Sequence, residues 1–186
     1  MSRWIYAGDK ESWRALLTAY QVSSFRLECQ QVYASPEEDK YLTQFLNGQR
    51  PETSWGFMRA TAGAQIAAGR TKTRVRVVVE PATLYTEMAL TIYPELLEIG
   101  EDIRFLGVEQ GEWPEGLPHH DYWIFDDREL WRMHYHENFR WKGAERIDDP
   151  AALEEHRNAR DAALARAVSL DEYLASRRAG KESSSA

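Results

Sequence analysis

The chain has 186 residues, of which 23 are Lys or Arg and 30 are Asp or Glu, so 23 − 30 gives a formal net charge of −7. This length suits one domain that buries a sizeable core without metal or disulfide. An apolar share of 43% with seven Trp excludes a wholly disordered chain, and a single cysteine excludes a disulfide framework or a Cys-rich zinc module. The acidic balance argues against direct binding of nucleic acid, because phosphate neutralisation needs a basic surface.

The termini and the apolar runs bear on the compartment. No apolar run follows a basic start, so the pattern of a secretory signal is missing. No stretch approaches the roughly 18–20 apolar residues of a membrane span. We therefore expect a cytoplasmic protein without membrane association. Cys29 has no His or basic neighbour in sequence and is expected to be a small buried filler.

The first part of the chain is predicted to alternate helices with a short strand. Apolar residues recur at helical spacing over residues 9–20, 35–48 and 54–69. The second of these begins at a Ser35 cap within a Ser-Pro-Glu-Glu start, which is typical of a capping box. Residues 23–28 alternate in polarity and are predicted as a strand or an extended stretch.

Strands dominate the second part of the chain. Residues 72–80 are dense in β-branched side chains and end at a proline, which makes them the strongest predicted strand. A helix is expected after a Thr83 cap, with a new turn at Pro94 that Gly100 ends. The remaining predictions are strands over 102–108, 121–125, 130–135 and 139–146, the last three as an antiparallel meander, a long helix from Pro150, and a capping box at Ser169 that opens a short helix.

This element order predicts an α+β fold in a single domain. A largely antiparallel sheet of about four to six strands is expected, covered by helices on one side, with a long C-terminal helix. Residues 1–22 are predicted as an N-terminal helical extension, 23–178 as the single α+β domain and 179–186 as a disordered tail.

A basic stripe is the most informative candidate for chemistry. Arg70, Lys72, Arg74 and Arg76 fall at a period of two, so on a strand they share one face. Guanidinium groups on a rigid strand can grip phosphate or carboxylate in bidentate fashion. The alternative is a solvated strand face that is paired with acidic neighbours.

The histidines suggest a metal site only weakly. His119, His120 and Asp121 are consecutive, and His134 and His136 share one face of a predicted strand. A site with two His and one carboxylate is conceivable, but no spacing fixes a third ligand. We expect ordinary loop and sheet-surface histidines, with no metal and no cofactor.

An acidic pair and two basic residues complete the charged candidates. Asp126 and Asp127 can bind Mg²⁺ or act as acid and base, although a tight turn between strands also favours Asp. Arg157 and Arg160 lie on the predicted final helix. If they converge with the basic stripe on one pocket, the site is suited to a phosphate-bearing substrate.

Aromatic residues are dense between 122 and 141, where seven lie within twenty residues. Trp123 is one of them, and alternate members are expected to line both faces of the sheet. Such rings interleaved with arginines can stack bases or a planar ligand. The alternative is that one face lies in the core and a helix or a partner covers the other.

Several segments together resemble DUF6879, an actinobacterial family of small proteins whose function is unknown. The segments are Phe25-Arg26-Leu27-Glu28, Arg74-Val75-Arg76-Val77-Val78, Gly100-Glu101-Asp102-Ile103, Asp121-Tyr122-Trp123-Ile124-Phe125-Asp126-Asp127, Met133-His134-Tyr135, Ala159-Arg160-Asp161-Ala162, Ala167-Val168 and Asp171-Glu172-Tyr173-Leu174. The resemblance covers about residues 24–176 and implies a neighbouring helix-turn-helix regulator as a partner, by association only. It implies no catalytic residue. Ser169, where the family tends to have Pro, is a departure.

The sequence therefore favours a cytoplasmic binding or regulatory module. It would engage a protein partner such as a helix-turn-helix regulator, or a small anionic ligand, through the basic strand and the aromatic sheet face. The alternative is a small enzyme or toxin-like protein that acts on a phosphate-bearing or nucleotide substrate. The predicted ligand-binding residues are Arg74, Arg76, Arg104, Trp123, Asp126, Asp127, Arg157 and Arg160.

Overall fold

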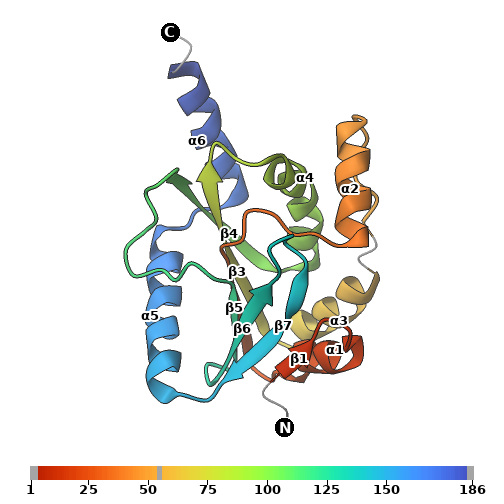
Figure 1. Ribbon diagram of the computed structural model, residues 1–186, viewed down its shortest axis with the longest axis vertical. Coiled ribbons are helices and arrows are strands. Elements are labelled where there is room, and N and C mark those ends of the chain that lie inside the picture. Colours follow the sequence, from red (N-terminus) through yellow and green to blue (C-terminus); the bar gives the residue numbers. More distant parts are fainter. Residues whose placement is uncertain (1–3, 54–55, 184–186) are drawn as a thin grey trace.

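The computed structural model describes residues 4–53 and 56–183, which form seven strands and six helices (Figure 1). In chain order these are β1 (Trp4–Tyr6), α1 (Lys10–Ala19), β2 (Ser23–Glu28), α2 (Pro36–Leu46), α3 (Gly56–Ala67), β3 (Thr71–Glu80), α4 (Leu84–Ile99), β4 (Asp102–Glu109), β5 (Tyr122–Phe125), β6 (Glu129–Tyr135), β7 (Trp141–Ile147), α5 (Pro150–Arg166) and α6 (Leu170–Ser183). The predicted start of the third helix at Ser54 lies outside the described residues.

All seven strands belong to one sheet in the order β1-β7-β6-β5-β2-β3-β4. The meander β5-β6-β7 is antiparallel, as predicted, and β1 and β2 extend it on either side in antiparallel pairing. Strands β2, β3 and β4 are parallel to one another. The predicted α+β class with a mostly antiparallel sheet is confirmed, although the sheet has seven strands rather than four to six.

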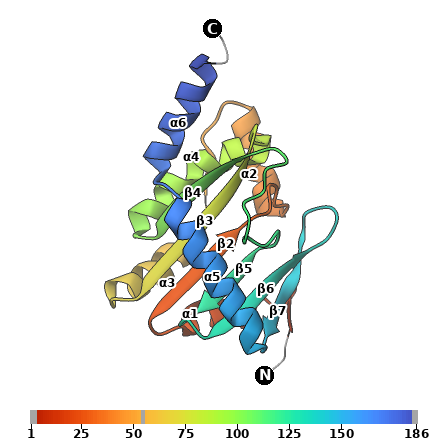
Figure 2. The ribbon, with the colours of Figure 1, turned by 90° about the vertical axis from the view of Figure 1, so that its left-hand side faces the viewer.

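The parallel pairs place most helices on one face of the sheet. Parallel neighbours need a crossover connection, and α2 with α3 connects β2 to β3, whereas α4 connects β3 to β4. Helix α5 lies on the opposite face, where Figure 2 shows it crossing in front of the strands. Helices therefore cover both faces, not the one face that was expected.

Three apolar clusters hold these layers together. On the α4 side, Met88, Phe105 and Tyr173 belong to a cluster that joins α4, β4 and α6. On the α5 side, Val75 packs in a cluster that includes Ala163. The third cluster packs α1 on the aromatic residues of β5 and β6. The parallel strands are thus buried on both sides, as such strands usually are.

Local capping chemistry explains where the helices begin. The Ser35 hydroxyl accepts from the Glu38 backbone N–H at 3.1 Å, and the Ser169 hydroxyl accepts from the Glu172 N–H at 3.3 Å. The Glu172 carboxylate in return accepts from the Ser169 N–H at 2.9 Å, which completes the predicted capping box.

Three predicted boundaries differ from the structure. Helix α4 continues through Pro94 to Ile99, because buried residues on both sides of the proline anchor it in the core. Residues 4–6 form an edge strand, and α1 packs on the sheet, so the predicted helical extension shares the core of the domain. Helix α6 continues to Ser183, past the predicted start of the tail at residue 179.

Candidate functional site

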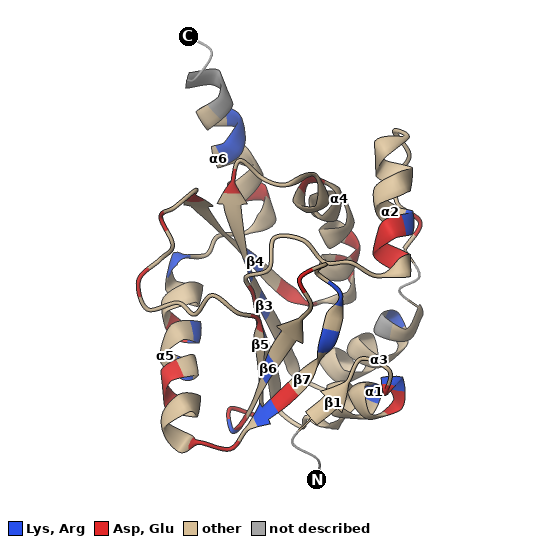
Figure 3. Ribbon diagram, in the orientation of Figure 1, with Lys and Arg blue, Asp and Glu red and all other residues tan. Residues whose placement is uncertain are grey.

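The basic stripe of β3 shares one face, as its spacing predicts, but this face is buried. Lys72 is 4% exposed, Arg74 7% and Arg76 0%, because α1 to α4 cover this side of the sheet. The face is therefore not solvated, although Arg74 is paired with acidic neighbours, as the alternative expected. Arg70 lies just before β3 and donates to the Tyr20 carbonyl at 2.5 Å. In Figure 3, basic positions fall on the central strands as well as on α5 and α6.

Arg74 is held by two buried carboxylates. Its guanidinium donates to Glu101 Oε1 and to Glu28 Oε1, each at 2.8 Å. Glu28 also pairs with Arg26 at 2.7 Å and accepts from the Tyr93 hydroxyl at 3.0 Å. Burial by itself raises the pKa of Glu28, but the charges of the nearby arginines outweigh it and lower the pKa to about 2.

Arg76 lies deeper, and its guanidinium is engaged by the fold except at Nε, which has no hydrogen-bond partner among the described residues. Its guanidinium donates to the Gln30 carbonyl at 2.5 Å and to the Tyr33 hydroxyl at 3.2 Å. It also contacts Thr86 on α4 at 3.4 Å and stacks over the Tyr33 ring. Arg76 does not line the cavity described next, so its predicted contact with a ligand gains no support from its position.

A cavity of about 340 Å³ lies over the charged strands, between the sheet and helices α1, α2 and α4. Side chains of β2, β3 and β5 form its floor, and Phe139, which is 44% exposed, stands at the β6–β7 turn. The size falls in the range of small-molecule sites. Aromatic rings form a large part of its wall, among them those of Trp13, Tyr33, Tyr85, Trp123, Tyr135 and Trp141.

Lys72 is the least satisfied cation of this floor. Its Nζ lies 5.1 Å from the centroid of the Trp123 ring and makes no hydrogen bond or ion pair with any residue that the structure describes. Burial lowers the pKa of Lys72 to about 8, and the charges of Arg74 and Arg26 act in the same direction. An ammonium group without a counter-ion in this position is costly to the fold.

Further nitrogen atoms at the cavity lack an acceptor. Within the described residues, Arg26 Nε, Trp123 Nε1 and Trp141 Nε1 are buried without a hydrogen-bond partner, and all three residues line the cavity. Each of these groups is a donor. The cavity therefore offers a surplus of donors, which an oxygen-rich ligand can satisfy.

Glu38 adds a titratable carboxyl to the wall. Burial raises its pKa to about 7, against a hydrogen bond to Tyr85, and the nearby charge of Glu28 adds to the rise. Near neutral pH this carboxyl therefore exchanges its proton, so the charge of the cavity depends on pH.

The predicted acidic pair lies at the β5–β6 turn and is divided between two roles. Asp126, at φ 50°, accepts the backbone N–H groups of Gln21, Val22 and Ser23 at 2.7 to 3.1 Å. Asp127 pairs instead with two arginines of α5. Both residues have a positive φ, as a tight turn rich in Asp permits.

Arg157 and Arg160 lie on the face opposite to the cavity. Arg157 Nε lies 3.2 Å and Arg160 Nη1 2.6 Å from Asp127 Oδ1. Helix α5 packs on the other side of the sheet from Arg74, so these groups do not share one cleft with the basic stripe. The interpretation as a cleft for a phosphate-bearing substrate loses its geometric basis.

Arg104 also lies apart from the cavity. It is on β4, pairs with Asp102 at 3.2 Å and borders a separate hollow where α6 begins. Of the predicted ligand-binding residues, only Arg74 and Trp123 line the cavity. The list of predicted ligand-binding residues omitted Arg26, Glu28, Glu38 and Lys72, which line the cavity. The period-two spacing of Arg26 and Glu28 on β2 is a pattern that could have indicated two of them.

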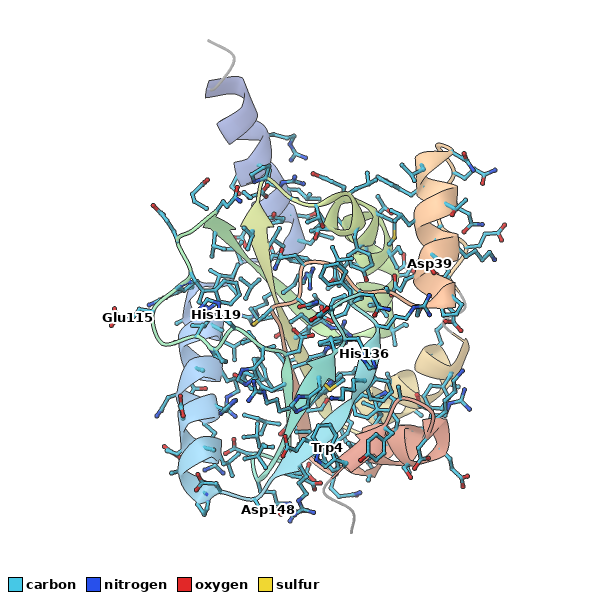
Figure 4. All side chains as sticks on the ribbon, viewed as in Figure 1. Trp4, Asp39, Glu115, His119, His136 and Asp148 are labelled. Carbon is cyan, nitrogen blue, oxygen red and sulfur yellow. The ribbon has the colours of Figure 1, made fainter. Side chains whose placement is uncertain are left out.

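The histidines are separated in space. His119 lies on the loop beside α5 and stacks on Trp113, whereas His136 lies at the β6–β7 turn (Figure 4). His120 Nε2 lies 3.0 Å from His156 Nε2, and His134 pairs with Glu145 at 3.1 Å. Across residues 4–53 and 56–183, no three His, Cys, Asp or Glu side chains are grouped so that they could hold a metal ion.

Fold and site together define a small α+β protein with a charged, aromatic-walled pocket on one sheet face. The chain belongs to the family described as Domain of unknown function (DUF6879), whose model matches residues 11–175. The matched range contains every residue that lines the cavity. No curated protein matches the chain. Among the helices of the described residues, none has the length and apolar content that crossing a bilayer needs.

Proposed function

We propose that this protein binds a small anionic ligand with a planar apolar body in the cavity between the sheet and α1, α2 and α4. The observation that carries the proposal is Lys72, a 4% exposed ammonium group with no acceptor among the described residues, which lies over Trp123. A carboxylate in the cavity supplies the missing acceptor and counter-charge together.

The charge balance supports an anion rather than a neutral ligand. The buried cluster at the floor contains four cations, which are Arg26, Lys72, Arg74 and Arg76, and three carboxylates, which are Glu28, Glu101 and Asp121. The difference of 4 − 3 leaves one positive charge while the Glu38 carboxyl on the cavity wall is protonated. Surrounding aromatic rings favour a planar body, because ring faces stack on planar groups.

Titration calorimetry on the full chain tests this function with benzoate, acetate, inorganic phosphate and the neutral isostere benzamide. We expect benzoate to bind at least about tenfold more tightly than benzamide, which corresponds to about 1.4 kcal/mol. Lys72→Met should lose this preference, whereas Arg157→Gln on the opposite face should retain it. Equal affinity for benzamide, or unchanged binding by Lys72→Met, contradicts the proposal.

Inorganic phosphate distinguishes the enzyme or toxin-like alternative. Saturable binding of phosphate that excludes benzoate and depends on Arg157 would favour a phosphate-bearing substrate at the α5 face. We expect none, because Arg157 and Arg160 are already paired with Asp127.

A protein partner, such as the helix-turn-helix regulator that the resemblance implies, remains a prediction. Such a partner would not touch Arg74 or Arg76, because helices cover both side chains. The same covering supports the expectation that nucleic acid is not bound through the basic strand. Co-purification with the neighbouring regulator, with and without benzoate, tests whether ligand binding changes the partnership.

A further inference from the structure

Lys72 is also the best-placed nucleophile of the molecule. Its amine lines the cavity, is 4% exposed and has no hydrogen-bond acceptor among the residues that the structure describes. No other group has to be displaced before a ligand reaches it. A desolvated lysine beside other cations is the arrangement that activates an amine for attack on carbonyl carbon.

The protonation state of Lys72 suits this chemistry. The pKa of Lys72 is lowered to about 8, mainly by burial; Glu101 and Glu28 oppose this effect, and Arg74 and Arg26 add to it. At pH 8 about half of the Lys72 amines are neutral, against about 0.4% for an exposed lysine of pKa near 10.4. The neutral form alone is nucleophilic, so Lys72 should react before the other lysines.

Arg26 provides an anchor for an acidic substituent of the same ligand. Its guanidinium lies 5.3 Å from the Trp123 ring centroid, against which Lys72 also lies, so one small molecule can reach both cations. Its side chain is 17% exposed and its Nε has no partner among the described residues. Arg26 pairs with Glu28 through Nη1 and with Asp121 through Nη2. Its Nε can therefore donate a hydrogen bond to a carboxylate of the ligand.

We propose that Lys72 forms an imine with the carbonyl carbon of a small 2-oxo or aldehyde acid, whose carboxylate lies on Arg26. This inference rests on the proposed anion-binding function. The neutral amine attacks the carbonyl carbon to give a carbinolamine, the C–O bond then breaks, and the oxygen leaves as water with the two protons of the amine. No oxidant or reductant takes part.

Trapping with borohydride tests the imine directly. The full chain is incubated at pH 8 with equimolar glyoxylate, the C=N bond is reduced to a stable amine, and peptides are mapped by mass spectrometry. The chain has five lysines, which are Lys10, Lys40, Lys72, Lys142 and Lys181. We expect labelling at Lys72 to exceed that at exposed Lys40 and Lys142 by at least about tenfold. Labelling spread evenly over the lysines overturns the proposal.

Variants separate this chemistry from a purely structural effect. Lys72→Arg keeps the charge and should abolish selective labelling, whereas the exposed Lys142→Arg should leave it unchanged. Arg26→Gln should reduce labelling by glyoxylate about tenfold but not labelling by glycolaldehyde, which has no carboxylate. Equal loss with both aldehydes contradicts the role of Arg26. Circular dichroism of each variant establishes that it is folded.

Two results distinguish the failure of this inference from the failure of the proposed function. If benzoate binds but glyoxylate leaves Lys72 unlabelled, the imine is wrong and anion binding stands. If Lys72 is labelled by glycolaldehyde as well as by glyoxylate, and benzoate neither binds nor competes, the amine is reactive but the site is not selective for anions.

Discussion

Glu28 and Arg74 form an ion pair of 2.8 Å between neighbouring parallel strands at the floor of the cavity. The same carboxylate pairs with Arg26 at 2.7 Å and accepts from Tyr93 on α4. One side chain thus connects β2, β3 and a covering helix. The pair is nearly closed to solvent, so breaking it leaves an uncompensated buried charge.

Removing that carboxylate should destabilise the fold strongly. Glu28→Gln leaves Arg26 and Arg74 without a shared counter-charge, and we expect the free energy of unfolding to fall by about 3–5 kcal/mol. Urea denaturation at pH 7 measures the change. Glu52→Gln, in an exposed pair with Lys40 at 3.5 Å, is the control and should change stability by less than about 0.5 kcal/mol.

The same residue predicts a loss of stability in acid. Glu28 has its pKa lowered from 4.5 to about 2 by the surrounding arginines, against the opposing effect of burial. The unfolded state therefore binds more protons between these values, and about 3 kcal/mol of stability that is present above pH 4.5 should be lost as the pH falls towards 2. Glu28→Gln should lack this part of the pH dependence; an unchanged acid slope would contradict the assignment.

Lys72, unlike Glu28, should lower the stability of the fold, because its buried ammonium group has no counter-ion among the described residues. Its pKa is lowered from 10.5 to about 8, mainly by burial, so the unfolded state binds more protons in this interval and stability should rise across it. Replacing the unpaired ammonium by Lys72→Met should stabilise the fold at pH 7 by about 1–3 kcal/mol and abolish the rise above pH 8. The exposed Lys142→Met is the control. A loss of stability by Lys72→Met would show that the ammonium group serves the fold rather than a ligand.

The contact between His120 and His156 predicts a second response to acid, on the α5 face. His156 Nδ1 lies 2.7 Å from the Ala152 carbonyl and must donate to it, so its Nε2 accepts from His120 Nε2–H. Burial, with Arg132 and His156, lowers the pKa of His120 from 6.5 to about 4. Discounted for solvent screening, about 1–2 kcal/mol of stability should be lost as the pH falls from 6.5 to 4. Comparing His120→Gln with the exposed His136→Gln over this range measures it; equal pH profiles would refute the prediction.

The attachment of β1 depends on the absence of a side chain at position 143. Gly143 has φ 155°, and a Cβ there would lie 2.5 Å from the Ile5 carbonyl oxygen. We expect Gly143→Ala to weaken the pairing of β1 with β7 and to cost about 2–4 kcal/mol. Hydrogen exchange at Ile5 and Ala144 measures the loosening. Gly63→Ala, whose nearest atom is 4.0 Å away, should be neutral or slightly stabilising.

Local patterns explain what could be predicted from the sequence. Caps such as Ser35 and Ser169 act on backbone groups three residues away, and the alternation of Lys72, Arg74 and Arg76 depends only on strand geometry. These features need no knowledge of distant contacts. The capped helix starts, the meander and the shared face of the stripe were therefore predictable.

The burial of the basic stripe could not be predicted from such local patterns. The buried position of Arg74 depends on β2 lying parallel to β3 with Arg26 opposite Arg74, although about fifty residues and two helices separate them in sequence. Lys and Arg are seldom buried without partners, which favoured the solvated alternative. The pairing of Asp127 with Arg157 and Arg160 was not predicted either, because it joins the β5–β6 turn to a helix about thirty residues further along the chain.

The Glu28 carboxylate is shared by two arginines and a tyrosine. This arrangement restricts which single substitutions the floor of the cavity can accept. Loss of Glu28 alone removes a counter-charge from two buried guanidinium groups and leaves Arg74 with Glu101 and Arg26 with Asp121, so a change at the floor is better tolerated together with a compensating substitution. Phe139 and Trp141 at the edge of the cavity hold no such network and can be exchanged one at a time. We therefore expect single substitutions at the edge of the cavity to be tolerated more readily than single substitutions at its charged floor.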